Sequence, residues 1–185
     1  MINREIAFEI LSQKKQLNLD FIAAENRDTF FIDSFDFFDE KIFASSRPGE
    51  KNLLSPKNLT TNPTSLLVRT DKRFAGAVSA ELTRQFGSYV DVRTWGGPTA
   101  ILEIVSKGIQ KAKGVQEIAN YLSIDQKDVI AFGDEHNDLE LLDYAGWGVA
   151  MANGTDQLKG IANDVTPLSN QEDGLAVYLE KLLKL

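Results

Sequence analysis

Residues 129–132 form a short, unbroken apolar run, Val-Ile-Ala-Phe, which stops at Gly133 and is followed at once by polar residues. Runs of this length without alternation are typical of strands buried on both faces, as in a parallel sheet. Val115, Ile118, Ala119 and Leu122 predict one apolar face of a helix before the run, and apolar residues at helical spacing also follow it. Further short runs follow at 147–151 and 164–166. Because strands alternate with helices, the C-terminal part of the chain is predicted to be α/β with right-handed crossovers.

The first hundred residues follow a different pattern. Ile2, Ile6 and Ile10 predict an opening helix, and a second helix is expected to begin after Asp71 and to run to about residue 86. Strands are predicted at 19–24, 28–33, 65–69, 89–95 and 100–105. Helices followed by paired strands indicate a small α+β domain, so we predict two domains, at residues 1–107 and 108–185.

The composition narrows the class of protein and its partners. An apolar share of 43% and a charged share of 25% are enough for a packed core. The net charge of −7 opposes binding along a nucleic-acid backbone, and no apolar run reaches the roughly 18 residues of a spanning helix. The chain has no cysteine for a disulfide or a thiolate, and its first residues do not resemble a secretion signal. We therefore expect a cytoplasmic protein with neither a nucleic-acid nor a membrane partner.

The residues after the first apolar run, Gly-Asp-Glu-His-Asn-Asp at 133–138, are the first candidate site. Ligands of open α/β sheets bind at the carboxyl ends of the strands, where this segment is expected to lie. Asp134 and Asp138 are four residues apart and can face the same side of a helical turn, with the uncharged Asn137 beside them. Two such carboxylates suit Mg²⁺. The alternative is that Asp134 caps a helix and that Asp138 is solvated, and spacing alone leaves both open.

Lys111 is the second candidate. It is expected near the start of the helix that leads into the same strand, and from there its ammonium group can reach a phosphate gathered at the strand ends. The alternative is an ordinary solvated surface lysine. Lys113, two residues on, could take the same role.

Five segments together resemble the haloacid dehalogenase-like phosphatases, and in particular the Cof-type sugar-phosphate phosphatases. They lie in the same order as in that family, over about the last 80 residues of the chain. They are Lys111 followed by Gly114-Val115, the run 129–138, Gly-Val-Ala-Met-Ala-Asn at 148–153, Asp-Val-Thr at 164–166, and Ser-Asn-Gln-Glu-Asp-Gly at 169–174. The resemblance implies that residues 108–185 are the C-terminal half of a three-layer, Rossmann-like α/β core with parallel strands. It implies that residues 1–107 are the α+β cap domain of such an enzyme.

The same resemblance assigns roles to single residues. Asp134 would coordinate Mg²⁺, and Asp138 would bind or orient that ion, directly or through water. Lys111 would neutralise the phosphoryl oxygens, Asn137 would order the acidic loop, and Asn153 would line the pocket. The implied activity is Mg²⁺-dependent hydrolysis of small phosphorylated metabolites such as sugar phosphates.

The nucleophile expected from this resemblance is not found. The family attacks phosphate with an aspartate in an Asp-x-Asp-Gly-Thr motif, and the 185 residues contain none. We therefore expect an incomplete enzyme that is inactive alone, because no aspartyl-phosphate can form. We also expect it to pair with a second copy or with a separately encoded N-terminal half of the core. The alternative is a non-catalytic remnant that binds phosphate or a partner.

Overall fold

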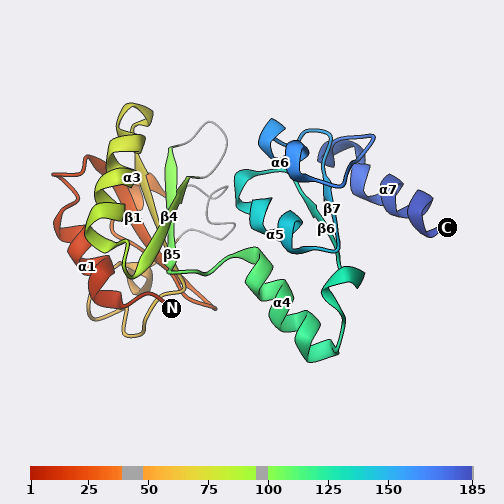
Figure 1. Cartoon of the computed structure of the whole chain (residues 1–185). Coiled ribbons are helices and arrows are strands. Elements are labelled where there is room, and N and C mark those ends of the chain that lie inside the picture. Colours follow the sequence, from red (N-terminus) through yellow and green to blue (C-terminus); the bar gives the residue numbers. More distant parts are fainter. Residues whose placement is uncertain (39–47, 95–99, 185) are drawn as a thin grey trace. The chain divides into compact units, whose positions relative to one another are not determined.

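The computed structural model describes residues 1–38, 48–94 and 100–184, and it divides into two compact units, Met1–Ile109 and Gln110–Leu185 (Figure 1). None of the helices in the described ranges is long and apolar enough to cross a membrane. The two units differ in the kind of sheet they contain, which is antiparallel in the first and parallel in the second.

The N-terminal unit is built on a five-stranded antiparallel sheet with the order β2-β1-β3-β5-β4. The strands and helices predicted from the sequence are confirmed, with shifts of at most two residues at their ends. Residue 95, the end of one predicted strand, lies outside the described residues. The elements are α1 (Arg4–Ser12), β1 (Leu19–Glu25), β2 (Phe30–Ile32), η1 (Phe35–Phe37), η2 (Glu50–Asn52), β3 (Ser65–Thr70), α3 (Lys72–Phe86), β4 (Val90–Thr94) and β5 (Ile101–Ser106).

Helices α1 and α3 pack on one face of this sheet, where they form the larger core of the unit. Ile10 of α1 and Leu82 of α3 lie in one buried cluster with Ile22 of β1. The helix predicted after Asp71 begins there because that carboxylate caps it and accepts the backbone N–H of Arg73. A second, smaller cluster lies on the other face, so the central strands are buried on both sides.

The C-terminal unit contains a three-stranded parallel sheet with the order β6-β7-β8. The predicted α/β alternation is therefore confirmed. The elements are α4 (Lys111–Leu122), η3 (Gln126–Asp128), β6 (Ile130–Gly133), η4 (His136–Asp138), α5 (Leu139–Tyr144), β7 (Trp147–Ala150), α6 (Asp156–Ile161), β8 (Asp164–Val165), η5 (Asn170–Glu172) and α7 (Gly174–Leu183).

Helices cover both faces of the parallel sheet. On one face, Leu142 of α5 and Leu158 of α6 form a buried cluster with Ala131 and Ala150 of the strands. On the other face, Tyr178 of α7 packs edge-on against Phe132, with ring centroids 5.5 Å apart. This arrangement brings the loops after all three strands to one edge of the sheet.

Helix α4 is confirmed, but part of its predicted apolar face is open to solvent. Ala119 is buried, whereas Ile118 is 61% exposed and Leu122 is 57% exposed. Spacing predicted the helix correctly because the apolar residues share one face. It did not predict what covers that face, which depends on the neighbours of α4. Within the described residues of this unit, the main packing partner of α4 is α5.

Candidate active site

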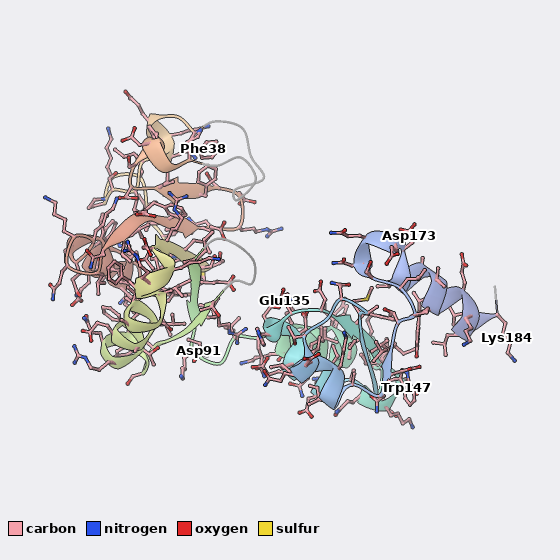
Figure 2. The ribbon with its side chains drawn as sticks, turned by 90° about the horizontal axis from the view of Figure 1, so that it is seen from above. Phe38, Asp91, Glu135, Trp147, Asp173 and Lys184 are labelled. Carbon is pink, nitrogen blue, oxygen red and sulfur yellow. The ribbon has the colours of Figure 1, made fainter. Side chains whose placement is uncertain are left out.

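The loops that follow β6, β7 and β8 border one cleft of the C-terminal unit. Residues that line it come from the start of α4 (Lys111), the loop after β6 (Asp134 and Asp138) and the segment that leads into α7 (Asn170 and Asp173). Figure 2 labels Asp173, which immediately precedes α7. The carboxyl ends of parallel strands are the usual ligand-binding edge of an α/β sheet, so the position agrees with that general rule.

Asp138 holds the loop after β6 together. Its side chain is buried, with the residue only 4% exposed. One carboxylate oxygen, Oδ2, accepts the backbone N–H groups of Asp134 at 3.0 Å and Glu135 at 3.2 Å. The other, Oδ1, accepts the ammonium group of Lys111 at 2.5 Å. Asp138 is therefore not the solvated residue of the alternative interpretation. Its two oxygens fix both the loop and the lysine.

Lys111 connects the start of α4 to this loop. Besides Asp138, its Nζ donates to Oδ1 of Asn137 at 3.4 Å. Half of the lysine side chain is exposed, at 50%, so its charge also reaches the cleft. Lys113, the other lysine considered, is exposed, and the described residues give it no side-chain partner at the site. The structure thus brings Lys111, Asn137 and Asp138 together.

Gly133, the last residue of β6, makes the close approach of Asp138 possible. A Cβ at this position would lie 2.5 Å from Cβ of Asp138 and 2.9 Å from Cδ1 of Leu142. Those distances are far below a van der Waals contact. The glycine at the end of the apolar run is therefore required by the packing of the acidic loop against its own strand.

Asp134 is held by two asparagine side chains. Its Oδ2 accepts Nδ2 of Asn153 at 3.2 Å and Nδ2 of Asn170 at 2.9 Å. The carboxylate therefore does not cap a helix. Its Oδ1 has no hydrogen bond within the described parts of the chain. The structure brings Asp134 and Asn153 together, and the backbone of Asp134 links this pair to Asp138.

A divalent cation fits the open carboxylate oxygen of Asp134. Mg²⁺ prefers oxygen ligands, keeps several waters and is commonly bound through one or two carboxylates plus substrate phosphate. Across residues 1–38, 48–94 and 100–184, no three His, Cys, Asp or Glu side chains come together as a closed metal cage. The donors present therefore suit an open, partly hydrated ion better than a buried structural metal.

Sequence reasoning did not single out Asn170 or Asp173, although both line the cleft. They lie in a segment that was quoted only for its family resemblance. The only signal in the sequence was that this segment follows the last predicted strand, because Asn170 and Asp173 lie five and eight residues after the end of β8. This segment is held by Glu172, whose carboxylate accepts the hydroxyl and backbone N–H of Ser169. These two hydrogen bonds, chiefly the one from the Ser169 hydroxyl, hold the pKa of Glu172 below its usual value.

Comparison with known proteins gives consistent matches over most of the chain. A profile of a family described as haloacid dehalogenase-like hydrolase matches residues 1–179. A phosphatase of Bacillus subtilis, the 5-amino-6-(5-phospho-D-ribitylamino)uracil phosphatase YitU, is 33% identical over 98% of this chain and 67% of its own length. A phosphoglycolate phosphatase of Methanopyrus kandleri is 48% identical over 43% of this chain and 34% of its own length.

A solved structure has the same fold. The crystal structure of a haloacid dehalogenase-like hydrolase from Bacteroides thetaiotaomicron superposes with a TM-score of 0.81 and 24% sequence identity. The match covers 98% of this chain and 67% of that one. The chain thus spans about two thirds of the length of the YitU phosphatase and of this Bacteroides hydrolase.

Proposed function

We propose, from the premise that this chain belongs to the haloacid dehalogenase-like hydrolases, that it supplies the cation- and phosphate-binding part of a phosphatase for small phosphorylated metabolites. The observation that carries the proposal is the cleft where Lys111 and the open oxygen of Asp134 meet. Phosphoryl transfer depends mainly on positioning and on cationic groups that stabilise the charge of the phosphoryl oxygens. The two relatives named above, both phosphatases of phosphorylated small molecules, support the substrate class.

Each residue of the cleft has a defined task in this proposal. Oδ1 of Asp134 would hold Mg²⁺, and the bound ion would supply positive charge at the phosphoryl oxygens. Lys111 has three N–H donors, of which Asp138 and Asn137 accept two, so one remains for a phosphate oxygen. Asp138 fixes the lysine and the loop, and Asn153 helps to fix Asp134.

The proposal also assigns roles to the two units. The antiparallel unit, Met1–Ile109, is the cap, and the parallel unit, Gln110–Leu185, is part of the catalytic core. The 185 residues contain no Asp-x-Asp-Gly-Thr sequence. Without that nucleophile the covalent step cannot begin, so we propose that these residues alone do not hydrolyse phosphomonoesters.

An unpaired strand edge supports a partner for this chain. Among the described strands, β6 pairs only with β7. Ile130 of β6 is 42% exposed, and on α4 Tyr121 is 87% exposed in addition to Ile118 and Leu122. Unpaired edges with apolar side chains favour addition of another strand. We propose that a polypeptide carrying the nucleophile strand pairs here. Dimerisation without such a segment, seen by sedimentation velocity, would instead identify a second copy as the partner.

Hydrolysis of an aryl phosphate with Mg²⁺ tests the function. The chain is assayed alone and then with the segment of the YitU phosphatase that has no counterpart in it, supplied as a separate polypeptide. We expect turnover only with that segment. Asp134→Ala should abolish it, and Asp143→Ala, an exposed aspartate of α5, should leave it unchanged.

Two results would contradict parts of the proposal. Turnover by the chain alone, lost in Asp134→Ala but not in Asp143→Ala, would mean that it carries an unrecognised nucleophile. No turnover under any condition, although the two polypeptides form a complex, would refute the phosphatase function.

A further inference from the structure

The carboxylate of Asp134 is oriented by two loops that are distant in the sequence. Asn153 follows β7 and lies 19 residues from Asp134, and Asn170 follows β8 and lies 36 residues from it. Both donate an amide N–H to the same oxygen, Oδ2. A carboxylate held at one oxygen by two donors has little freedom to rotate, so the position of the other oxygen, Oδ1, is fixed as well.

Asn170 also determines which way the amide of Asn153 points. Its backbone N–H donates to Oδ1 of Asn153 at 2.9 Å. A backbone N–H can only donate, so the oxygen of the Asn153 amide must face it and the NH₂ group must face away. The NH₂ group is then placed against Asp134. Asn170 therefore acts on Asp134 twice, directly through its side chain and indirectly through Asn153.

The segment around Asn170 is itself well anchored. Thr166 is buried and accepts the backbone N–H of Ala152 at 2.9 Å through its hydroxyl oxygen. The same hydroxyl donates to the backbone oxygen of Leu168 at 2.6 Å. Glu172 closes the next turn on Ser169. These bonds tie the loop after β8 to the loop after β7, so Asn170 is a rigid support.

We propose that Asn170 is a positioning residue, which holds the carboxylate of Asp134 so that Oδ1 is presented to a divalent cation. The inference rests on the proposed function, because it assumes that Asp134 is a cation ligand. Groups that hydrogen-bond to a metal ligand commonly change metal affinity by about 10- to 100-fold. The side chain of Asn170 supplies one of the two amide donors to Oδ2 of Asp134, so its loss should weaken cation binding within that range.

Binding of Mn²⁺ to the 185-residue chain tests the proposal without any need for catalysis. Mn²⁺ broadens nearby amide signals in a ¹⁵N correlation spectrum even when binding is weak. In the wild-type chain, the signals of the loops after β6 and β7 should broaden saturably with added Mn²⁺. In Asn170→Ala the concentration for half broadening should rise by about tenfold or more. Asn120→Ala, which removes an exposed asparagine of α4, should match the wild type.

The possible results separate the inference from the proposed function. Equal Mn²⁺ affinity of the wild type and of a folded Asn170→Ala would overturn the positioning role and leave the cation site intact. No saturable broadening in the wild-type loops would overturn the cation site, and the inference with it.

If Asn170→Ala does not fold, a second measurement tests whether the amide of Asn170 holds the carboxylate of Asp134. In Asp134→Ala, the side-chain NH₂ signals of both Asn153 and Asn170 should shift, since both have lost their common acceptor. Unchanged signals for Asn170 would show that its amide does not hold Asp134, and would overturn the inference.

Discussion

Replacing Gly133 with alanine should destabilise the C-terminal unit although it adds only one methyl group. The new Cβ would lie 2.5 Å from Cβ of Asp138, 2.9 Å from Cγ of the same residue and 2.9 Å from Cδ1 of Leu142. Both neighbours are buried, at 4% and 2% exposure. To restore ordinary contacts, one of them must move by about 1 Å in a close-packed interior, where overpacking costs about 1–3 kcal/mol.

The upper half of that range is expected here. Asp138 cannot move freely, because its carboxylate accepts two backbone N–H groups and Lys111. We therefore expect a loss of about 2–3 kcal/mol in the free energy of unfolding. For a urea slope of about 2 kcal/mol per M, the midpoint should fall by roughly 1–1.5 M.

Urea denaturation followed by Trp147 fluorescence measures this change. The chain has two tryptophans, so replacing Trp95 with phenylalanine leaves Trp147 as the reporter of its own unit. Gly114→Ala is the matched control, since no atom lies within 4 Å of its added Cβ inside helix α4. It should stabilise the unit by about 0.4–1 kcal/mol. A Gly133→Ala midpoint equal to that of the wild type would refute the packing argument.

Three further changes test other parts of the structure. Asp138→Asn turns an amide N–H toward the Lys111 ammonium and should cost about 1.5–3 kcal/mol in urea denaturation; an unchanged midpoint would contradict this. The pKa of Glu172 lies below the usual glutamate value because its carboxylate accepts hydrogen bonds from Ser169. These bonds stabilise the folded chain at pH values above the usual glutamate pKa, and the stabilisation is lost as the pH falls through the pKa of the folded state. A carboxyl NMR titration of Glu172 with a normal midpoint would disprove this expectation. Asp33→Ala removes the carboxylate that accepts the ammonium group of Lys14 and the backbone N–H of Ile22. The loss should destabilise the N-terminal unit by about 1–3 kcal/mol, as measured by thermal unfolding; Asp28→Ala, at an exposed position, is the control, and an Asp33→Ala midpoint equal to that of the control would contradict the expectation.

Helices and strands were predictable because their patterns are local. The N-cap of α3 was found at Asp71, since a short acidic side chain before a helical run satisfies the first backbone N–H groups. Strand β6 was found because unbroken apolar runs are buried on both faces. The exposure of Ile118 and Leu122 was not predictable, because spacing identifies an apolar face and not the element that covers it.

The candidate site was predictable only in part, for a similar reason. Lys111, Asp134 and Asp138 could be named because their residue types and their place beside one strand suggest a phosphate and cation site. The task of Asp138 could not be read from the sequence, since it depends on backbone N–H groups that only the folded loop presents. Asn170 was missed because its contact joins two loops through the order of the strands.

The link between Asn170 and Asp134 has a thermodynamic consequence. If closing the loop after β8 helps a cation to bind, then a bound cation must by the same free energy hold that loop closed. The backbone N–H of Asn170, which donates to Asn153, would then be released to solvent less often when the cation is present. Occupancy at the end of β6 and the local stability of the segment before α7 are therefore two readouts of one equilibrium.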